Sequence, residues 1–374
     1  MTTAKKTHGL ENVIAGQSAI CTVGTSNGFG LRYRGYAIED LAEQASFEEV
    51  AYLMLFEKLP NQKELNHFKK TLIEKRDLPE TLKTILENIP KSAHPMDVLR
   101  SGCSVLGSLE PENESHHALS IAIRLIANFP AILLYWHHFH QYNKKISTDL
   151  EDDSTAAYFL HMLNEKTPDT LQTEMLNVSL ILYAEHGFNA STFSARVTTA
   201  TGSDFYSAIC SAIGTLRGAL HGGANEGAYE LIAQFKNVEN AEIGVRKMLE
   251  KKKRIMGFGH RVYTICDPRA TIIKNWAKKL AHQAHDNSFY DIAERIEEIM
   301  WKEKKLFPNI DYFSAPAYAF CHIPKMMFTP LFAMSRITGW TAHIIEQRRN
   351  NRLIRPSCEY TGPSPRNFIS INAR

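Results

Sequence analysis

The sequence predicts an all-α protein with a minor β-hairpin near its N-terminus. Most of the chain consists of segments in which apolar side chains recur every three or four positions, the spacing of one face of a helix. Two short segments rich in strand-forming residues, 18–24 and 30–36, are separated by the turn-prone segment 25–29 and indicate the hairpin. Strands and helices do not alternate in a repeated pattern, so neither a TIM barrel nor a Rossmann sheet is expected.

Two segments in the first half of the chain carry clear helix signals. Residues 46–56 begin with Ser46 and have Glu49 three positions later, which is the spacing of a capping box. Residues 170–186 place their apolar side chains on one stripe at helical spacing. Both segments are therefore predicted to be helices that pack against a core.

Helix signals continue in the second half. Residues 289–305 carry an apolar stripe, and residues 329–347 form another long candidate helix. Thr329 stands directly before Pro330, a pair that favours Thr329 as the N-cap. The longest apolar segment, 120–136, is interrupted by an arginine and a proline, so we expect a buried helix there and not a membrane span.

Composition and charge limit the classes of function. With 374 residues, of which 44% are apolar, the chain is long enough for a large core and more than one domain. A net charge of +3, spread evenly, argues against a nucleic-acid partner and suits small anionic ligands. The six cysteines contain no C-x-x-C pair, so the sequence predicts no disulfide framework, and it fits a reducing cytoplasm. The first ten residues lack an apolar segment, and no secretory signal is expected.

A predicted helix start carries a histidine beside two glycines, in the stretch ALHGGANEGAYELI at residues 219–232. Histidine titrates near neutral pH, glycine allows close approach to the backbone, and a helix N-terminus offers free N–H groups. His221 is therefore a candidate for an imidazole held against a developing negative charge. A turn with a solvated histidine is the alternative.

Two further stretches place a polar side chain among glycines or apolar residues. GFGHRVYTICDPRA contains His260 and Arg269, and FPNIDYFSAPAY contains Asp311. Apolar neighbours desolvate a carboxylate and raise its pKa toward that of a useful general base. Asp311 is thus a candidate base, and a helix N-cap is the alternative for this residue.

Basic residues supply candidate anion sites. A guanidinium group binds a carboxylate through two hydrogen bonds in one plane, so Arg269, Arg336 and Arg355 suit a dicarboxylate. The stretch RIMGFGH follows three lysines and suits an adenine nucleotide with phosphates, such as coenzyme A, although it matches no phosphate-loop pattern. Ion pairs are the alternative for the arginines, and a solvated helix end is the alternative for the lysines. No stretch has the ligand spacing of a known metal motif.

Together these motifs resemble the citrate synthase family. LHGGAN, GFGHRVY with DPRA, NIDYFSA, MFTPLFAMSRITGW and IRPSCEYTG occur in the family's order and at its spacing, and the similarity extends nearly end to end. Within the family, YAEHGFNASTFSARV and HPMDVLRSGCSVLG are most similar to the bacterial 2-methylcitrate synthases. Two positions depart from these patterns: Ala219 replaces a frequent proline, and Gly187 replaces a glutamate frequent in 2-methylcitrate synthases.

The resemblance implies a helical fold of two domains. Residues 1–217 and 328–374 would form the large domain, and residues 218–327 would form a smaller mobile domain that closes over the first substrate. A homodimer, a cytoplasmic location and the absence of a membrane or nucleic-acid partner are also expected. The family needs no metal or redox cofactor, because acyl-CoA is itself a substrate.

The resemblance also implies three catalytic residues. Asp311 would take a proton from the carbon next to the thioester carbonyl. His221 would stabilise the resulting enolate, with the helix start keeping its imidazole neutral, as for the neutral histidine of triosephosphate isomerase. His260 would polarise the ketone of oxaloacetate and protonate the alkoxide as the C–C bond forms.

Binding residues follow from the same motifs. His186, Arg269 and Arg336 would hold oxaloacetate, and Arg355 would reach across the dimer into the partner's site. The coenzyme A pocket would be lined by Arg254, Ile255, Met256, Gly257 and Phe258.

The implied reaction joins propionyl-CoA to oxaloacetate and hydrolyses the thioester, giving 2-methylcitrate and CoA in propionate catabolism, with acetyl-CoA also accepted. A citrate synthase of the tricarboxylic acid cycle stays open, because one methylene in a pocket is worth only about 1–3 kcal/mol. A catalytically inactive helical binding protein is a third possibility, which the presence of all three catalytic residues argues against. A metal-dependent aldolase-type enzyme would need histidines and carboxylates at ligand spacing.

Overall fold

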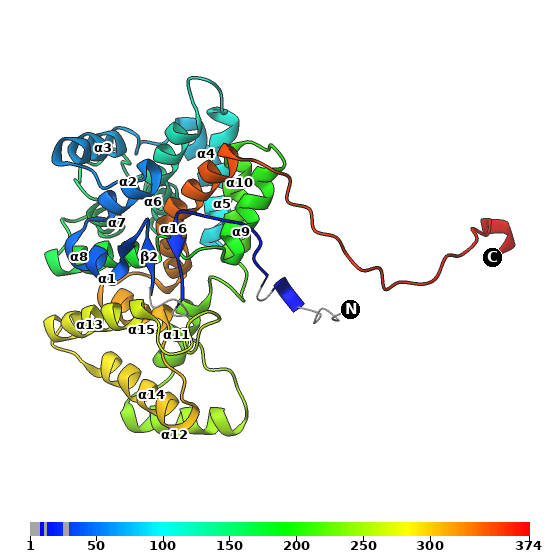
Figure 1. Cartoon of the computed structure of the whole chain (residues 1–374). Helices are drawn as coiled ribbons and strands as arrows, with labels where there is room; N and C mark the ends of the chain where they lie inside the picture. The colour runs from blue at the N-terminus through cyan, green and yellow to red at the C-terminus, as the bar shows by residue number, and fades with distance from the viewer. Residues whose placement is uncertain (1–7, 11–12, 25–29) are drawn as a thin grey trace.

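The computed structural model describes residues 8–10, 13–24 and 30–374, and this part of the chain is mostly helical, as predicted (Figure 1). Three 3-10 turns lie at His8–Leu10 (η1), Lys325–Met327 (η2) and Ile371–Ala373 (η3). The α-helices are α1 (Ile38–Gln44), α2 (Phe47–Phe56), α3 (Gln62–Glu74), α4 (Glu80–Asn88), α5 (Pro95–Leu109), α6 (Ala118–Tyr142), α7 (Thr155–Asn164), α8 (Thr170–Tyr183), α9 (Ala190–Ala200), α10 (Phe205–Leu216), α11 (Ala224–Ala233), α12 (Val238–Glu250), α13 (Pro268–Gln283), α14 (Ser288–Lys304), α15 (Ile310–Phe320) and α16 (Phe328–Arg349).

The predicted hairpin is part of a small three-stranded sheet. Strands β1 (Cys21–Thr22), β2 (Arg32–Tyr33) and β3 (Tyr36–Ala37) pair antiparallel in that order. The pairing of β1 with β2 confirms the prediction, and the predicted connection 25–29 lies outside the described residues. The third strand was not predicted; Arg34 and Gly35 form its two-residue turn with φ values of 47° and 92°, as a tight hairpin requires.

Two helix starts test the predicted caps. Ser46 and Glu49 form the predicted capping box at α2, with both reciprocal hydrogen bonds present. The prediction for Thr329 is wrong: α16 begins at Phe328 after a 3-10 turn, and its N-cap is Met327. Instead of capping the helix, the Thr329 hydroxyl donates to Glu226 Oε1 at 2.5 Å and lies 3.3 Å from the backbone oxygen of Gly222, contacts that the sequence does not show.

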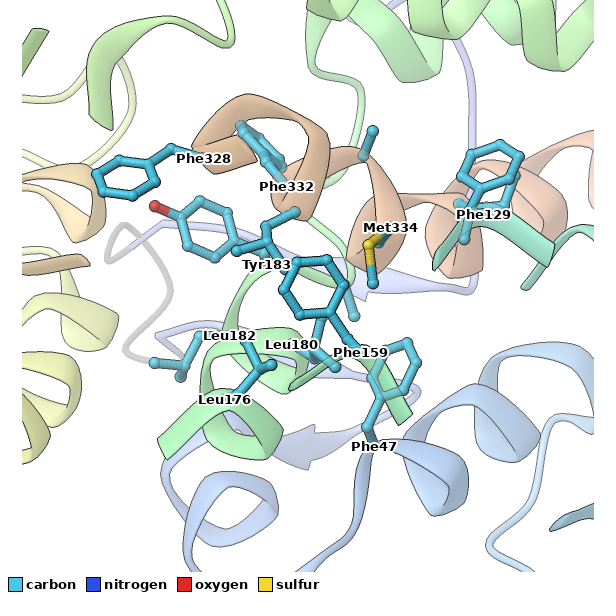
Figure 2. Packing of buried hydrophobic residues seen from close by; sticks show 14 of the residues in the cluster. Phe47, Phe129, Phe159, Leu176, Leu180, Leu182, Tyr183, Phe328, Phe332 and Met334 are labelled. Atoms are coloured by element: carbon cyan, nitrogen blue, oxygen red, sulfur yellow. The ribbon is translucent and has the colours of Figure 1, made fainter. Parts of the chain in front are cut away.

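The core of the larger part of the molecule surrounds α6, α8 and α16. Figure 2 shows Phe129, Phe159, Leu180 and Met334 in the buried cluster, to which they come from four different helices, α6, α7, α8 and α16. Helix α6 is long and apolar enough to cross a membrane, but 78% of its most apolar window is buried inside the protein. This burial agrees with the expectation for residues 120–136, since the core helix of a folded domain passes the same test.

Helices α11 to α15 form a group at one end of the molecule (Figure 1). Within this group α12 packs on α14, and α15 packs on both α11 and α13. Helix α13 also packs on α1 and α8, so it joins the group to the larger part of the fold. The domain boundaries at residues 217/218 and 327/328 stay a prediction.

Candidate active site

His221 lies in the turn that leads into α11, as predicted. Its Nε2 accepts a hydrogen bond from the backbone N–H of Ser191 at 3.3 Å and lies 2.9 Å from the Ser191 hydroxyl oxygen. A ring nitrogen that accepts an N–H bond carries no proton, so the proton of the neutral ring is on Nδ1. Burial, together with the Arg336 guanidinium, lowers the pKa of His221 to about 4, so the ring is neutral at pH 7.

The glycine after His221 is required by close packing. A Cβ at Gly222 would lie 2.3 Å from the backbone oxygen of Leu216, and the Gly222 N–H donates to this same oxygen at 3.0 Å. The turn can therefore fold back on the end of α10 only with glycine at this position. This contact places His221 against Ser191, at the start of α9.

His260 is neutral through the opposite tautomer. Its Nδ1 accepts hydrogen bonds from the backbone N–H groups of Val262 at 3.0 Å and Tyr263 at 3.2 Å, so the ring proton is on Nε2. Burial and the Arg269 guanidinium lower the pKa of His260 to about 4. The two histidines thus offer neutral N–H donors, Nδ1 in one and Nε2 in the other.

Asp311 is the second residue of α15 and not its N-cap. The N-cap is Asn309, whose Oδ1 accepts the backbone N–H of Asp311 at 3.1 Å, so the alternative of an N-cap for Asp311 is wrong. Burial raises the pKa of Asp311 to about 6, although the Tyr183 hydroxyl, 2.7 Å from Oδ1, and two nearby arginines oppose this rise. A carboxylate with this pKa suits general-base chemistry near neutral pH.

The loop that carries His260 is bonded to the segment that precedes Asp311. The Gly259 N–H donates to the backbone oxygen of Phe307 at 2.8 Å, and the Asn309 N–H donates to that of Gly257 at 2.9 Å. Gly257 has a φ of +85°, and a Cβ there would lie 2.8 Å from Cβ of Tyr312. These contacts hold two stretches that are about fifty positions apart, and with them two candidate catalytic groups, in one fixed arrangement.

Arg269 is buried and paired with a carboxylate that the sequence analysis did not select. Its Nε and Nη2 donate to Asp267 Oδ1 and Oδ2 at 2.9 and 2.8 Å, which leaves Nη1 outside the pair. Asp267 Oδ2 also accepts the backbone N–H of Ile310 at 3.1 Å, at the start of the helix that carries Asp311. Arg269 lowers the pKa of Asp267, against the effect of burial, so this carboxylate stays ionised.

Arg336 and His186 complete the group. Arg336 is buried on α16, its Nε donates to the backbone oxygen of Tyr183 at 2.7 Å, and its guanidinium lies over the Phe332 ring. The Nε2 of His186 lies 3.1 Å from the Tyr263 hydroxyl, and its ring centre is 5.0 Å from that of His260. Burial is the main cause that lowers the pKa of His186, and the nearby Arg269 and His260 lower it further.

The structure therefore brings six of the predicted residues into one region. Arg336 acts electrostatically on His221 and Asp311, and Arg269 acts on His260 and Asp311. The six residues are His186, His221, His260, Arg269, Asp311 and Arg336.

The predicted coenzyme A residues 254–258 follow α12 and lead into the His260 loop. Arg254 is exposed, and the next four residues are buried or half-buried. The Phe258 ring packs on Tyr312 with ring centres 4.4 Å apart, and the Met256 side chain passes close to Gly227 of α11. The role of this segment in binding coenzyme A stays a prediction.

Arg355 does not lie near the other predicted residues of its own chain. It is exposed in an extended segment after α16, and Figure 1 shows this C-terminal segment running away from the body of the molecule. The expectation that Arg355 enters a partner's site stays a prediction.

Sequence reasoning missed four residues that hold the site together. Asp267 had a signal, because an aspartate directly before Pro268 is a typical N-cap, and it does cap α13. Tyr183, Ser191 and Tyr263 had no local signal, since their hydroxyl groups contact residues 30 or more positions away.

Gly187, which departs from the pattern of 2-methylcitrate synthases, has a left-handed backbone with φ +58°. Glycine adopts this conformation without strain, whereas a residue with a Cβ is disfavoured there. A Cβ at Gly187 would lie 3.3 Å from the Val23 side chain, which is close but not prohibitive. Glycine at this position therefore avoids the backbone strain that a residue with a side chain would bring.

Comparison with known proteins assigns the family. The sequence model described as "Citrate synthase, C-terminal domain" matches residues 9–357. This chain belongs to the citrate synthase family. Among curated relatives of the family, it is 52% identical to a 2-methylcitrate synthase of Shewanella oneidensis over the full length of both chains. It is 43% identical to citrate synthase 2 of Bacillus subtilis, covering 98% of this chain and 99% of the relative.

Solved structures of citrate synthases share the fold. The citrate synthase of Thermoplasma acidophilum, in a ternary complex with carboxymethyl coenzyme A and oxaloacetate, matches with a TM-score of 0.90 and 34% identity over 98% of both chains. The citrate synthase of Thermotoga maritima matches with a TM-score of 0.87 and 38% identity over the same shares. The predicted all-α citrate synthase-like fold is confirmed. Among the described residues, no group of three histidine, cysteine, aspartate or glutamate side chains is placed to hold a metal ion.

Proposed function

We propose that this protein is a 2-methylcitrate synthase that condenses propionyl-CoA with oxaloacetate and hydrolyses the thioester. One observation carries the proposal: a partly buried carboxylate with a pKa of about 6 lies in one site with two neutral histidines, each of which accepts a backbone N–H through one ring nitrogen and carries its proton on the other. This is the set that enolate formation and ketone activation need. The 52% identity to a 2-methylcitrate synthase supports propionyl-CoA as the acyl substrate.

In the first step Asp311 takes a proton from the carbon next to the thioester carbonyl. The electron pair of the broken C–H bond moves into the enolate, whose oxygen accepts a hydrogen bond from His221 Nδ1. His221 is neutral because burial lowers its pKa to about 4, so it donates a hydrogen bond without holding a permanent charge. A neutral donor of this kind stabilises charge as it develops.

In the second step the enolate carbon attacks the ketone carbon of oxaloacetate. His260 donates from Nε2 to the ketone oxygen and transfers this proton to the oxygen as the C–C bond forms, and the imidazole then regains a proton from water. Water hydrolyses the resulting acyl-CoA, which releases free CoA and makes the overall reaction effectively irreversible. The reaction uses acyl-CoA as a substrate and needs no resident metal or redox cofactor.

His186, Arg269 and Arg336 bind oxaloacetate in this proposal, with the Nη1 side of Arg269 available because Asp267 takes the other side. Arg355 of a second copy completes the site, which makes the functional unit a homodimer. The extended course of the C-terminal segment away from its own chain supports this exchange.

Coenzyme A is bound by the segment between α12 and His260, in which Arg254 is exposed and available for phosphate. The residues proposed for this pocket are Arg254, Ile255, Met256, Gly257 and Phe258.

We further infer the arrangement around the site. Residues 218–327 form a small domain that closes on residues 1–217 and 328–374 after oxaloacetate binds. The enzyme acts in the cytoplasm, and its partners are its two substrates and a second copy of itself.

The experiment compares kcat/KM for propionyl-CoA and acetyl-CoA, each with saturating oxaloacetate, by following thiol release. A preference for propionyl-CoA is expected. A preference for acetyl-CoA would make the protein a citrate synthase, the alternative that the 43% identity to citrate synthase 2 favours. No thiol release with either substrate would overturn the proposal and leave an inactive binding protein with this fold.

A further inference from the structure

A tyrosine outside the predicted set touches the base directly. The Tyr183 hydroxyl donates to Asp311 Oδ1 at 2.7 Å, and it comes from α8, 128 positions earlier in the sequence. Figure 2 shows Tyr183 at the edge of the buried cluster, beside Phe328 and Phe332, with its hydroxyl oxygen at the end of the ring away from Leu180 and Phe159. The ring of Tyr183 is therefore anchored in the core, while its polar end reaches the catalytic carboxylate.

We propose that Tyr183 is a positioning residue for the base: it holds Asp311 through Oδ1, so that Oδ2 faces the acyl substrate, and it favours the ionised carboxylate. This inference rests on the proposed function of Asp311. Through Tyr183, helix α8 contributes to proton abstraction, in addition to leading into the segment that contains His186.

The hydrogen bond has a fixed direction. Burial and the ionised Asp311 raise the pKa of Tyr183, so the phenol keeps its proton and acts as a donor at neutral pH. A hydrogen bond to a charged acceptor is stronger than one between neutral groups. The bond is therefore strongest when Asp311 is ionised and ready to take a proton.

A second acceptor lies beside the first. The Ser314 hydroxyl oxygen is 3.0 Å from the Tyr183 hydroxyl, and Ser314 donates its own hydrogen to the backbone oxygen of Ile310 at 2.8 Å. When Asp311 takes a proton during turnover, the Tyr183 hydroxyl can donate to Ser314. The Tyr183 hydroxyl therefore has an acceptor within hydrogen-bond distance in either state of the base.

Other charged groups also act on Asp311, so the contribution of Tyr183 needs to be separated from theirs. Arg269, at the start of α13, and Arg336, on α16, lower the pKa of Asp311. Asp267, the N-cap of α13, raises it. Tyr318, on the same helix as the base, interacts with it electrostatically. None of these groups is removed when the Tyr183 hydroxyl is deleted.

The test compares Tyr183→Phe with the matched control Tyr158→Phe. Tyr158 is also buried, and its hydroxyl also donates over 2.7 Å, but its acceptor is the backbone oxygen of Thr148 and not a site residue. The readouts are kcat, KM for oxaloacetate and the pH dependence of kcat/KM for the acyl-CoA.

For Tyr183→Phe we expect kcat to fall by about tenfold or more and the acid limb of the pH profile to move up by about one pH unit, as loss of a hydrogen bond to a charged group predicts. KM for oxaloacetate should stay within about twofold, since its binding groups are intact. The control should keep the parent's kcat and pH profile. Equal losses in the two variants, or an unchanged acid limb in Tyr183→Phe, would overturn the inference.

A measurement without turnover separates this inference from the proposed function. The pKa of Asp311 is higher in the folded protein than in the unfolded chain. Between these two pKa values the folded protein binds more protons, so the contribution of Asp311 to the free energy of unfolding declines as pH rises toward the folded pKa. We expect this decline to extend to higher pH in Tyr183→Phe, measured as the difference in Tm between each protein and its version with Asp311→Asn added. Identical declines in the presence and absence of the Tyr183 hydroxyl would contradict the inference even if no substrate were turned over.

Discussion

The starts of α13 and α15 each carry an aspartate, and the two carboxylates have opposite environments. Asp267 is held by two hydrogen bonds from Arg269, and its pKa is lowered. Asp311 has a tyrosine hydroxyl as its hydrogen-bond partner instead of a cation, and burial raises its pKa to about 6. One carboxylate is thereby fixed as a permanent anion that orients an arginine, and the other is able to take a proton near neutral pH.

The two carboxylates are also mechanically linked. Asp267 accepts the first backbone N–H of α15, from Ile310, and Asp311 is the next residue. The pair that orients Arg269 for oxaloacetate therefore also positions the helix that carries the base. Burial alone therefore does not decide the role of these two carboxylates, because the hydrogen-bond partner of each one decides it.

The largest effect is expected for Asp311→Asn. Loss of the general base should lower kcat by roughly 10²- to 10⁴-fold, measured by thiol release. Because Asp311 has no ion-pair partner and its ionised form is disfavoured by burial, Tm at pH 7 should not fall. Near-normal turnover by this variant would remove Asp311 from the mechanism.

Asp267→Asn, unlike Asp311→Asn, is expected to lower the stability of the fold. It leaves the buried Arg269 without a counter-charge, which should cost about 3–5 kcal/mol of unfolding free energy in urea titrations. As a control, Glu303→Gln breaks the surface pair with Arg246 and should cost less than about 1 kcal/mol. If both substitutions cost the same, the Asp267–Arg269 pair does not have the structural role assigned to it.

The two arginines proposed to bind oxaloacetate from different chains also differ in their environment. Arg355 is exposed, whereas Arg269 is buried. Arg355→Ala should raise KM for oxaloacetate by roughly 10- to 100-fold, the range for a lost hydrogen bond to a charged group. Hybrid dimers of Arg355→Ala and Asp311→Asn chains should regain one intact site in two. Hybrids no more active than the two parent variants at low oxaloacetate would place Arg355 outside the partner's site.

The sequence predicts local features of this fold well and contacts between distant segments poorly. The capping box at Ser46 lies within four residues and was predicted, because its signal is local. The prediction of an N-cap at Thr329 was wrong, because α16 begins at Phe328, directly after the 3-10 turn Lys325–Met327 and earlier than the Thr-Pro pair suggests. Propensity for a cap is a weak signal where the hydroxyl hydrogen-bonds to another segment, here mainly to Glu226 of α11.

The same limit applies to the site. Residue types and motif order identified His221, His260 and Asp311, but the sequence did not reveal what makes the two histidines neutral. That depends on burial, on charges from other helices and on backbone N–H groups such as that of Ser191, which lies 30 positions from His221. The tautomers, and with them the nitrogens that face substrate, follow only from the folded structure.

The most direct test of the account is the pH dependence of kcat/KM for propionyl-CoA with saturating oxaloacetate. An essential base must be ionised, so activity should fall tenfold per pH unit below its pKa. The account predicts one acid limb with its midpoint at or above about 6, since bound oxaloacetate adds negative charge, and no such limb in the residual activity of Asp311→Asn. A midpoint near 4, or an unchanged limb in Asp311→Asn, would contradict the assignment of Asp311 as the base.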